Sequence, residues 1–131
     1  MDASNLLLPL MGFLPIDDTR VISTVQRIRQ ELVHGPFVKR YRTEETDDGL
    51  TGSEGAFTLR SFWLVRVLAS MGEVEEAQRL FHELLGYANH LGLFSEMVDP
   101  QTGAALGNFP QAFTHIGLIL AARDCGLDQD C

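Results

Sequence analysis

Glu96 is the carboxylate whose surroundings in the chain best suit chemistry. It follows a short apolar run and precedes a turn-rich loop that leads into an apolar helical stretch. Within the loop, residues 99–103 (DPQTG) are typical of a turn, because Pro fixes φ at the second position and Gly can adopt the backbone conformation that closes the turn. A carboxylate held beside such a loop, which leads into a buried helix, is a candidate for chemistry. On the residues alone, however, a single loop glutamate is more often a solvated surface group.

The helix after this loop is expected to begin near Asn108. Asn108 can cap its first N–H groups, and Pro110 is tolerated in the first turn because no intrahelical donor is lost there. Gln111 and His115 are four residues apart, so they should share a face of this helix. They could orient Glu96 or bind a ligand, although a helical histidine among apolar residues is more often a core group.

Hydrophobic periodicity predicts an all-α fold of about five helices and no strand. The helices are expected to start near Asp2, Asp17, Ser53, Glu73 and Asn108. The first, third and fifth are apolar nearly all round, whereas the second and fourth have one apolar face. Connections back to an apolar helix are long, roughly 15 residues or more against a usual 2–8. The pattern therefore predicts antiparallel helical hairpins, with a buried inner row, an amphipathic outer row and both long loops at one end.

Local signals set the expected helix ends. Gly35-Pro36 should end the second helix, Ser53 should cap the third and Gly72 should stop it. The fourth helix is expected to remain amphipathic as far as Gly92.

Composition indicates one globular domain over residues 1–131. Hydrophobic residues make up 45% and charged residues 21% of the chain, an ordinary balance for a folded protein. The net charge of −8 argues against nucleic acid and anionic membrane as partners, because both bind basic surfaces. Residues 2–14 are apolar but too short to span a bilayer, and they lack a basic leader. Cys125 and Cys131 do not make a disulfide framework, which predicts free thiols and a cytoplasmic location.

No metal or cofactor site is expected from the sequence. His34, His82 and His90 have no metal-ligand spacing with a cysteine or another histidine. There is no glycine-rich phosphate loop and no GxSxG elbow. Trp63 could stack on a sugar ring, but its apolar neighbours favour a place in the core.

Three ordered stretches of the chain resemble the C-terminal end of the catalytic domain of family 15 glycoside hydrolases, the glucoamylases and their trehalase-like relatives. The matching residues are Asp2 to Ser4 and Leu6 to Pro9, then Glu54 to Phe57 and Ser61 to Val65, then Ser95-Glu96, Asp99-Pro100, Thr102-Gly103, Leu106 to Phe113 and His115. The resemblance covers almost the whole chain. It implies an arc of an (α/α)6 toroid, a ring of six inner and six outer helices, with the active site at the end where the long loops gather.

The resemblance also implies roles for individual residues. Glu96 would be the general base of an inverting hydrolysis of an α-glucoside or oligosaccharide, while a second carboxylic acid protonates the leaving oxygen. The family's acid lies upstream of the matching residues, so negligible hydrolysis is expected from this chain alone. Arg42, with Tyr41, resembles the loop that binds the first glucosyl unit, and Arg40 could be the equivalent instead. Glu54 could bind sugar hydroxyls or only favour a helix N-terminus.

Two other functions stay open on the sequence, a helical interaction module and a sugar-binding protein without turnover. Gly72 to Gly92 is similar to one helix of a tetratricopeptide-type repeat, but the apolar helices start roughly 50 residues apart rather than 34. An arc of helices would also expose apolar flanks. This predicts a homo-oligomer, or association with the missing part of the toroid.

Overall fold

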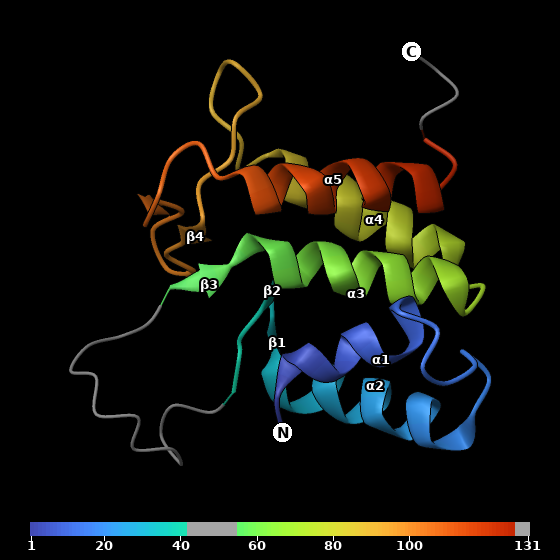
Figure 1. Cartoon of the computed structure of the whole chain (residues 1–131). Helices are drawn as coiled ribbons and strands as arrows, with labels where there is room; N and C mark the ends of the chain where they lie inside the picture. The colour runs from blue at the N-terminus through green and yellow to red at the C-terminus, as the bar shows by residue number, and fades with distance from the viewer. Residues whose placement is uncertain (42–54, 128–131) are drawn as a thin grey trace.

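The computed structural model describes residues 1–41 and 55–127, and the described chain is mostly helical (Figure 1). In chain order its elements are η1 (Ala3–Leu6), α1 (Leu7–Leu10), α2 (Thr19–Leu32), β1 (Val33–His34), β2 (Phe37–Val38), β3 (Ala56–Phe57), α3 (Thr58–Ser70), α4 (Val74–Leu85), β4 (Met97–Val98), β5 (Ala105–Leu106) and α5 (Ala112–Asp124). The predictions for Arg42, Ser53, Glu54 and Cys131 lie outside the described residues.

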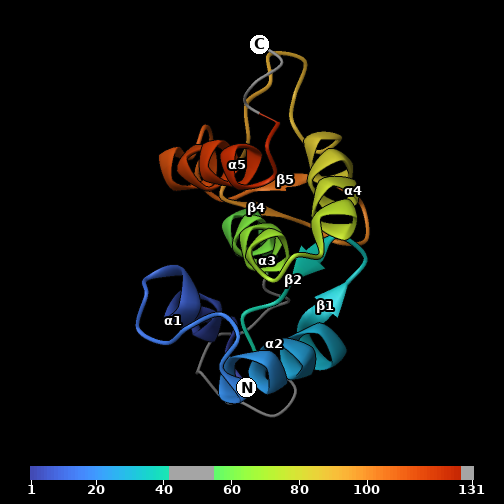
Figure 2. The same ribbon diagram turned by 90° about the vertical axis from the view of Figure 1, so that its right-hand side faces the viewer.

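The helices form two rows, as the alternation of apolar and amphipathic segments predicts. Figure 2 shows the helices nearly end-on, with α1, α3 and α5 in one row and α2 and α4 on the other side. Helix α3 packs against both α4 and α5, and eight of its thirteen residues are buried. The prediction of an all-α class built from helical hairpins is therefore confirmed.

The two outer helices each bury one stripe of apolar residues. The stripe is Val21, Val25, Ile28 and Leu32 on α2, and Ala77, Leu80, Phe81 and Leu84 on α4. On the solvent side, the Arg29 guanidinium of α2 lies 2.8 Å from a carboxylate oxygen of Glu73 and 2.8 Å from one of Glu76. The acids at the start of α4 therefore also join the two outer helices.

The N-terminal segment is less helical than the sequence predicts. The side chain of Asp2 accepts a hydrogen bond from the backbone N–H of Ser4 at 2.8 Å and so caps the first turn. The helix then ends at Leu10, because Gly12 adopts a φ of +71° that no helix continues. Four large apolar side chains of this segment are exposed, Met1, Leu8, Met11 and Phe13.

Five short strands, which the sequence analysis does not predict, build the connections. β1 and β2 form an antiparallel hairpin, and β3, β4 and β5 form an antiparallel sheet in that order. The hairpin ends α2 at Leu32, before the predicted stop at Gly35-Pro36. Each strand is two residues long, which is too short for an alternating pattern to be recognised.

The two apolar helices α3 and α5 begin later than predicted. Ala56 and Phe57 form strand β3, so α3 begins at Thr58 rather than near Ser53. Helix α5 begins at Ala112, with Gln111 at the N-cap position and no side-chain cap. Asn108 does not cap it, because the Asn108 side chain donates to Glu96 instead.

Helix α4 ends at Leu85 rather than near Gly92. The side-chain oxygen of Asn89 accepts hydrogen bonds from the backbone N–H groups of Leu91 and Leu93, both at 2.9 Å. These bonds satisfy the backbone outside a helix. Leu91 is consequently 69% exposed instead of lying on a buried stripe.

Candidate functional site

The N-terminal ends of α3 and α5 lie at the same end of the molecule, next to the β3–β4–β5 sheet (Figure 1). Backbone hydrogen bonds join these segments: Thr58 N–H donates to the Glu96 carbonyl at 3.4 Å, and Gln111 N–H donates to the Phe94 carbonyl at 3.0 Å. The long connection between α4 and α5 is therefore anchored at this end. The other long connection includes residues 42–54, which lie outside the described part of the chain.

A hollow of about 230 Å³ opens where these segments meet. It is lined by Phe57, Leu59, Arg60, Glu96, Gln111, Phe113 and Thr114. Two of the sequence-predicted residues, Glu96 and Gln111, are therefore brought together. The hollow combines apolar walls with one carboxylate, one amide and one guanidinium, which is the usual character of a small-molecule pocket.

Asn108 holds one oxygen of Glu96. Oε2 of Glu96 accepts a hydrogen bond from the Asn108 backbone N–H at 3.0 Å and another from the Asn108 side-chain amide at 2.8 Å. The Glu96 backbone N–H in turn donates to the Asn108 carbonyl at 2.9 Å. Oε1 accepts no hydrogen bond from the described residues. The carboxylate thus has one oxygen occupied and one available.

The residue before Asn108 has to be glycine for two reasons. Gly107 has a φ of +73°, a conformation that L side chains rarely adopt. A Cβ at this position would also lie 2.8 Å from Oε2 and 3.1 Å from Cβ of Glu96. Gly103 has the same φ, but a Cβ there would meet only the Tyr87 ring, at 3.7 Å.

His115 connects α5 to the segment before Glu96 and does not line the hollow. Its Nδ1 lies 2.8 Å from the Gln111 carbonyl, and its Nε2 accepts a hydrogen bond from the Phe94 N–H at 3.3 Å. Because Nε2 accepts, the geometry assigns the ring proton to Nδ1. The ring also packs edge-on against Phe94, with centroids 5.9 Å apart.

Arg60 on α3 lines the hollow and is absent from the residues that the sequence analysis proposes. Its guanidinium carbon lies 4.3 Å from the centroid of the Phe57 ring. Its charge also acts on Asp2. Burial raises the pKa of Asp2, but the hydrogen bonds from Ser4 and the charges of Arg40 and Arg60 outweigh this effect, so the pKa lies below its ordinary value. Arg60 therefore places positive charge at this end of the inner row.

A signal for Arg60 is present in the sequence. Arg60 and Arg66 are the only charged residues in α3, which is otherwise apolar or small. Arg66 is accounted for by a structural ion pair, since its Nε donates to Asp124 at 2.7 Å. A charge in the first turn of an apolar inner helix, at the end that carries the loops, could have been recognised as a candidate.

Tyr41 and Arg40 lie beside the N-terminus of the chain. The Arg40 guanidinium carbon lies 5.2 Å from the centroid of the Tyr41 ring, and its Nε lies 3.7 Å from the Asp2 carboxylate. The Ala3 N–H donates to the Arg40 carbonyl at 2.9 Å. Neither residue is among those that line the hollow of Glu96.

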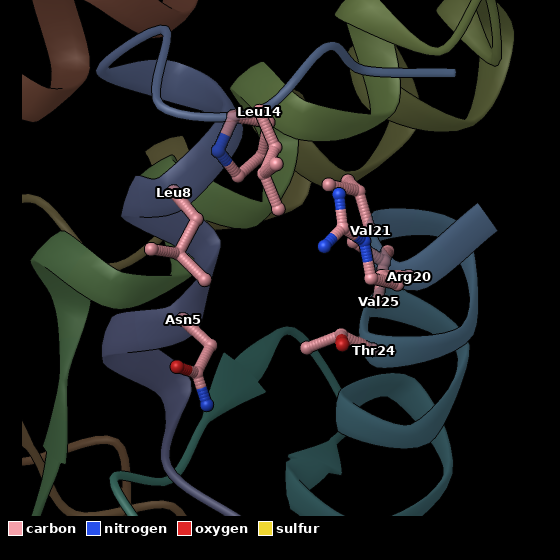
Figure 3. A pocket seen from close by; sticks show the side chains of 8 residues that line it. Asn5, Leu8, Leu14, Arg20, Val21, Thr24 and Val25 are labelled. Atoms are coloured by element: carbon pink, nitrogen blue, oxygen red, sulfur yellow. The ribbon is translucent and has the colours of Figure 1, made fainter. Parts of the chain in front are cut away.

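Two further hollows contain none of the predicted site residues. Figure 3 shows the first, about 80 Å³ between α1 and α2, with Asn5 and Leu8 facing Val21 and Thr24. The second, about 320 Å³, is lined by His34, Lys39, Gly55, Asp99, Pro100, Gln101 and Leu106. Within residues 1–41 and 55–127, no group of three His, Cys, Asp or Glu side chains could hold a metal ion. No helix in the same part of the chain is long and apolar enough to cross a membrane.

Comparison with known proteins gives consistent results. A profile described as "Glycosyl hydrolases family 15" matches residues 1–84 and 68–123. A trehalase of Mycolicibacterium smegmatis is 54% identical over 121 residues, covering 92% of this chain and 18% of the relative. A trehalase of Thermoplasma acidophilum is 46% identical over 123 residues, covering 93% of this chain and 21% of the relative. The chain spans about a fifth of the length of these relatives.

A solved structure has the same fold. It is described as "Glycosidase Wild Type" and superposes with a TM-score of 0.80 at 24% identity, covering 97% of this chain and 36% of that chain. This likeness shows the architecture, in which the two rows of helices correspond to an arc of a larger helical ring. The family is shown by the profile match, which covers nearly all of the described residues: the chain belongs to glycosyl hydrolase family 15.

Proposed function

We propose that this chain forms the base-bearing part of the catalytic domain of an inverting α-glycosidase acting on trehalose or a similar α-glucoside, with Glu96 as the general base. The observation that carries this proposal is the hollow in which Glu96 meets Gln111 and Arg60, with Oε1 of Glu96 available. The substrate class is supported by the relatives, which are trehalases. A hollow of about 230 Å³ suits one sugar ring better than a long oligosaccharide.

In this mechanism Glu96 Oε1 accepts a proton from a water molecule. The water oxygen forms a bond to the anomeric carbon while the bond from that carbon to the leaving oxygen breaks on the opposite face. The leaving oxygen receives its proton from a second carboxylic acid. Gln111 and Arg60 can donate hydrogen bonds to sugar hydroxyls, and the planar fork of an arginine suits vicinal hydroxyl groups.

The second carboxylic acid has to come from outside the hollow as described. Inversion requires two carboxyl groups about 6.5–9.5 Å apart, with the sugar and the water between them. Among the described residues that line the hollow, Glu96 is the one with a carboxyl group. We therefore propose that another part of a toroid supplies the acid and that this chain alone has negligible turnover.

A chimeric enzyme tests the role of Glu96. The matching 121 residues of the Mycolicibacterium smegmatis trehalase are replaced by this chain, and glucose release from trehalose is measured. Glu96→Gln in the chimera removes the base but keeps the shape, and turnover is expected to fall by about 10²–10⁴-fold. The matched control is Glu83→Gln on α4, an exposed residue that does not line the hollow. Activity of the Glu96→Gln chimera within a few-fold of its parent would overturn the proposal.

Sugar binding without turnover is the second candidate function, and the single carboxylate lining the hollow favours it. It predicts that this chain binds trehalose or glucose by calorimetry and that Arg60→Leu weakens the binding. It also predicts that a chimera with an otherwise intact enzyme stays inactive. An active chimera would reject this function and support the first.

The proposed partner is a second copy of the chain or the remaining helices of a toroid. Helix α5 and the N-terminal segment both present large exposed apolar side chains, including Phe13 and Phe113, which an aqueous surface disfavours. We expect a homo-oligomer at micromolar concentration when no other partner is supplied. Light scattering would contradict this if it gave the mass of a monomer.

The proposed setting is the cytoplasm. Cys125 is a buried free thiol, and its pKa is raised by burial and by the neighbouring charge of Asp124. A raised pKa keeps the thiol protonated and unreactive. Cell fractionation tests the location, and recovery of the protein outside the cell would contradict it.

A further inference from the structure

We propose that Asn108 is a positioning residue that selects Oε1 of Glu96 as the proton-accepting atom. This inference rests on the proposed function of Glu96 as a general base. Its basis is the set of contacts between Glu96 and the turn that precedes α5. In that turn, two groups donate hydrogen bonds to one carboxylate oxygen, and a glycine lies close to the same oxygen.

The first step concerns the backbone around Glu96. Two hydrogen bonds join the backbone of Phe94 to the start of α5. The Gln111 N–H donates to the Phe94 carbonyl at 3.0 Å, and the Phe94 N–H donates to Nε2 of His115 at 3.3 Å. The Thr114 hydroxyl donates to the Ser95 carbonyl at 3.1 Å. These bonds fix the main chain that carries Glu96, so the remaining freedom is rotation of the Glu96 side chain.

The second step concerns that rotation. The backbone N–H and the side-chain amide of Asn108 both donate to Oε2, at 3.0 and 2.8 Å. Two donors on one oxygen hold the carboxylate plane in one orientation, and bonds to an ionised group are stronger than neutral ones. The same two bonds occupy Oε2, which leaves Oε1 as the oxygen that can accept a hydrogen bond from a water molecule.

The third step concerns space. The absent side chain of Gly107 is what allows Oε2 to approach the turn, because a Cβ there would lie 2.8 Å from that oxygen. Gly107 and Asn108 therefore act on the same atom, one by giving room and the other by donating hydrogen bonds. A general base must be held in reach of the proton it removes, and a misplacement of about 1 Å can cost about 10²-fold in rate.

The direct test measures the side-chain rotamer of Glu96 by NMR coupling constants in the full chain. The two hydrogen bonds from Asn108 to Oε2 are expected to hold one rotamer. Asn108→Ala removes one donor, so Glu96 is expected to change from one dominant rotamer to a mixture. Asn108→Asp has nearly the same shape but replaces the donor with a like charge, so the dominant rotamer is expected to be lost more fully.

The matched control is Asn89→Ala, in the same connection between α4 and α5. The Asn89 side chain accepts two backbone hydrogen bonds but does not contact Glu96 in the described structure. It should lower stability while leaving the Glu96 rotamer unchanged. A second pair of variants avoids Asn108 itself: Gly107→Ala should displace Oε2 and change the rotamer, whereas Gly103→Ala adds a comparable backbone strain and should not.

The activity arm uses the chimeric enzyme described above. Asn108→Ala is expected to lower kcat by about 10–100-fold with little change in KM. An unchanged Glu96 rotamer together with an unchanged kcat would overturn the positioning role, even if Glu96→Gln is inactive. A changed rotamer with a fully active Glu96→Gln chimera would instead overturn the function of Glu96 and leave only the contact.

Discussion

Helices α3 and α5 are alike in sequence but not in their surroundings. Each has thirteen residues and is apolar nearly all round. Helix α3 buries eight of them, whereas α5 buries only three, Thr114, Gly117 and Ala121, which lie on one face. Phe113, Ile116 and Ile119 of α5 are 68%, 52% and 66% exposed.

The difference lies in the neighbours of each helix. Helix α3 is packed between α4 and α5, with α1 on a further side, while the contacts of α5 are mainly with α3. Figure 2 shows α5 at one end of the inner row and α3 within it. In the proposed toroid, α5 would be buried on every side like α3, and its exposed face is the one on which another element would pack.

The largest expected effect on stability comes from truncating one phenylalanine of α3, compared with truncating one of α5. Phe62 of α3 is fully buried, with its ring centroid 5.7 Å from that of Phe94 and 6.1 Å from that of Phe81. Phe62→Ala is expected to cost about 3–5 kcal/mol of unfolding free energy. Phe113→Ala on α5 is expected to change it by less than about 0.5 kcal/mol in a monomeric sample. Urea unfolding measures both, and equal losses would break the comparison.

The next effect tests the ion pair that joins the two helices at their C-terminal ends. Asp124 of α5 accepts a hydrogen bond from Arg66 of α3 at 2.7 Å, and Asp124→Asn is expected to cost about 1–3 kcal/mol at neutral pH. Burial raises the pKa of Asp124, but the hydrogen bonds and charges of Arg66 and Arg123 outweigh it, and the pKa lies below its ordinary value of 3.8.

The sign of the pH dependence follows from that lowered pKa. The unfolded chain binds a proton at Asp124 at a higher pH than the folded chain does. The contribution of the pair is therefore complete above about pH 4 and is lost as the pH falls through the lowered pKa. The unfolding free energies of the parent and the Asp124→Asn variant should be measured from about pH 2 to about pH 7. The difference between them should shrink as the pH falls. A constant difference would contradict the assignment.

A smaller effect is expected at the closest approach of α3 and α5. A Cβ on Gly117 would lie 2.7 Å from Cδ1 of Leu59 and 3.3 Å from Cβ of Phe62. Overpacking costs about 1–3 kcal/mol, whereas replacing a helical glycine with alanine gains about 1 kcal/mol. Gly117→Ala should therefore be destabilising by about 1 kcal/mol. A stabilised variant in thermal unfolding would mean that the two helices can separate without loss.

The smallest effect on stability is expected from Ile119→Ser, on the outer face of α5. Because this side chain is mostly exposed, the unfolding free energy of a monomeric sample should change by less than about 0.5 kcal/mol. The proposed association should nevertheless weaken, and light scattering would show a lower mean mass than for the parent. An unchanged mass would place the association surface elsewhere.

The row arrangement could be predicted because it depends on residue spacing within each helix. The apolar stripe at Val21, Val25, Ile28 and Leu32 and the stop at Gly72 are local patterns, and both are confirmed. The end of α4 was predicted too late, because the competing hydrogen bonds of Asn89 depend on how the following loop folds. The five short strands likewise depend on pairing between distant segments.

The candidate site was predicted only in part. Glu96 and Gln111 do meet in the hollow, whereas Arg42 and Glu54 lie outside the described residues. Asn108 was predicted to cap a helix, and the same side chain binds Glu96, twelve residues away, instead. Capping would use the side-chain oxygen as an acceptor, whereas the contact with Glu96 uses the side-chain N–H as a donor. An asparagine side chain carries both groups, so the residue type could not distinguish between the two roles.

The sequence itself determined the order of the helices, the alternation of buried and amphipathic segments, and the presence of Glu96 shortly before the last apolar helix. These features follow from periodicity and local turn chemistry, which act over a few residues. Tertiary structure alone decided that Arg60 shares the hollow with Glu96, that Asn108 holds Oε2 and that α5 keeps an exposed apolar face. Each of these depends on which segments pack together in the fold. The spacing of neighbouring residues does not determine contacts between distant segments.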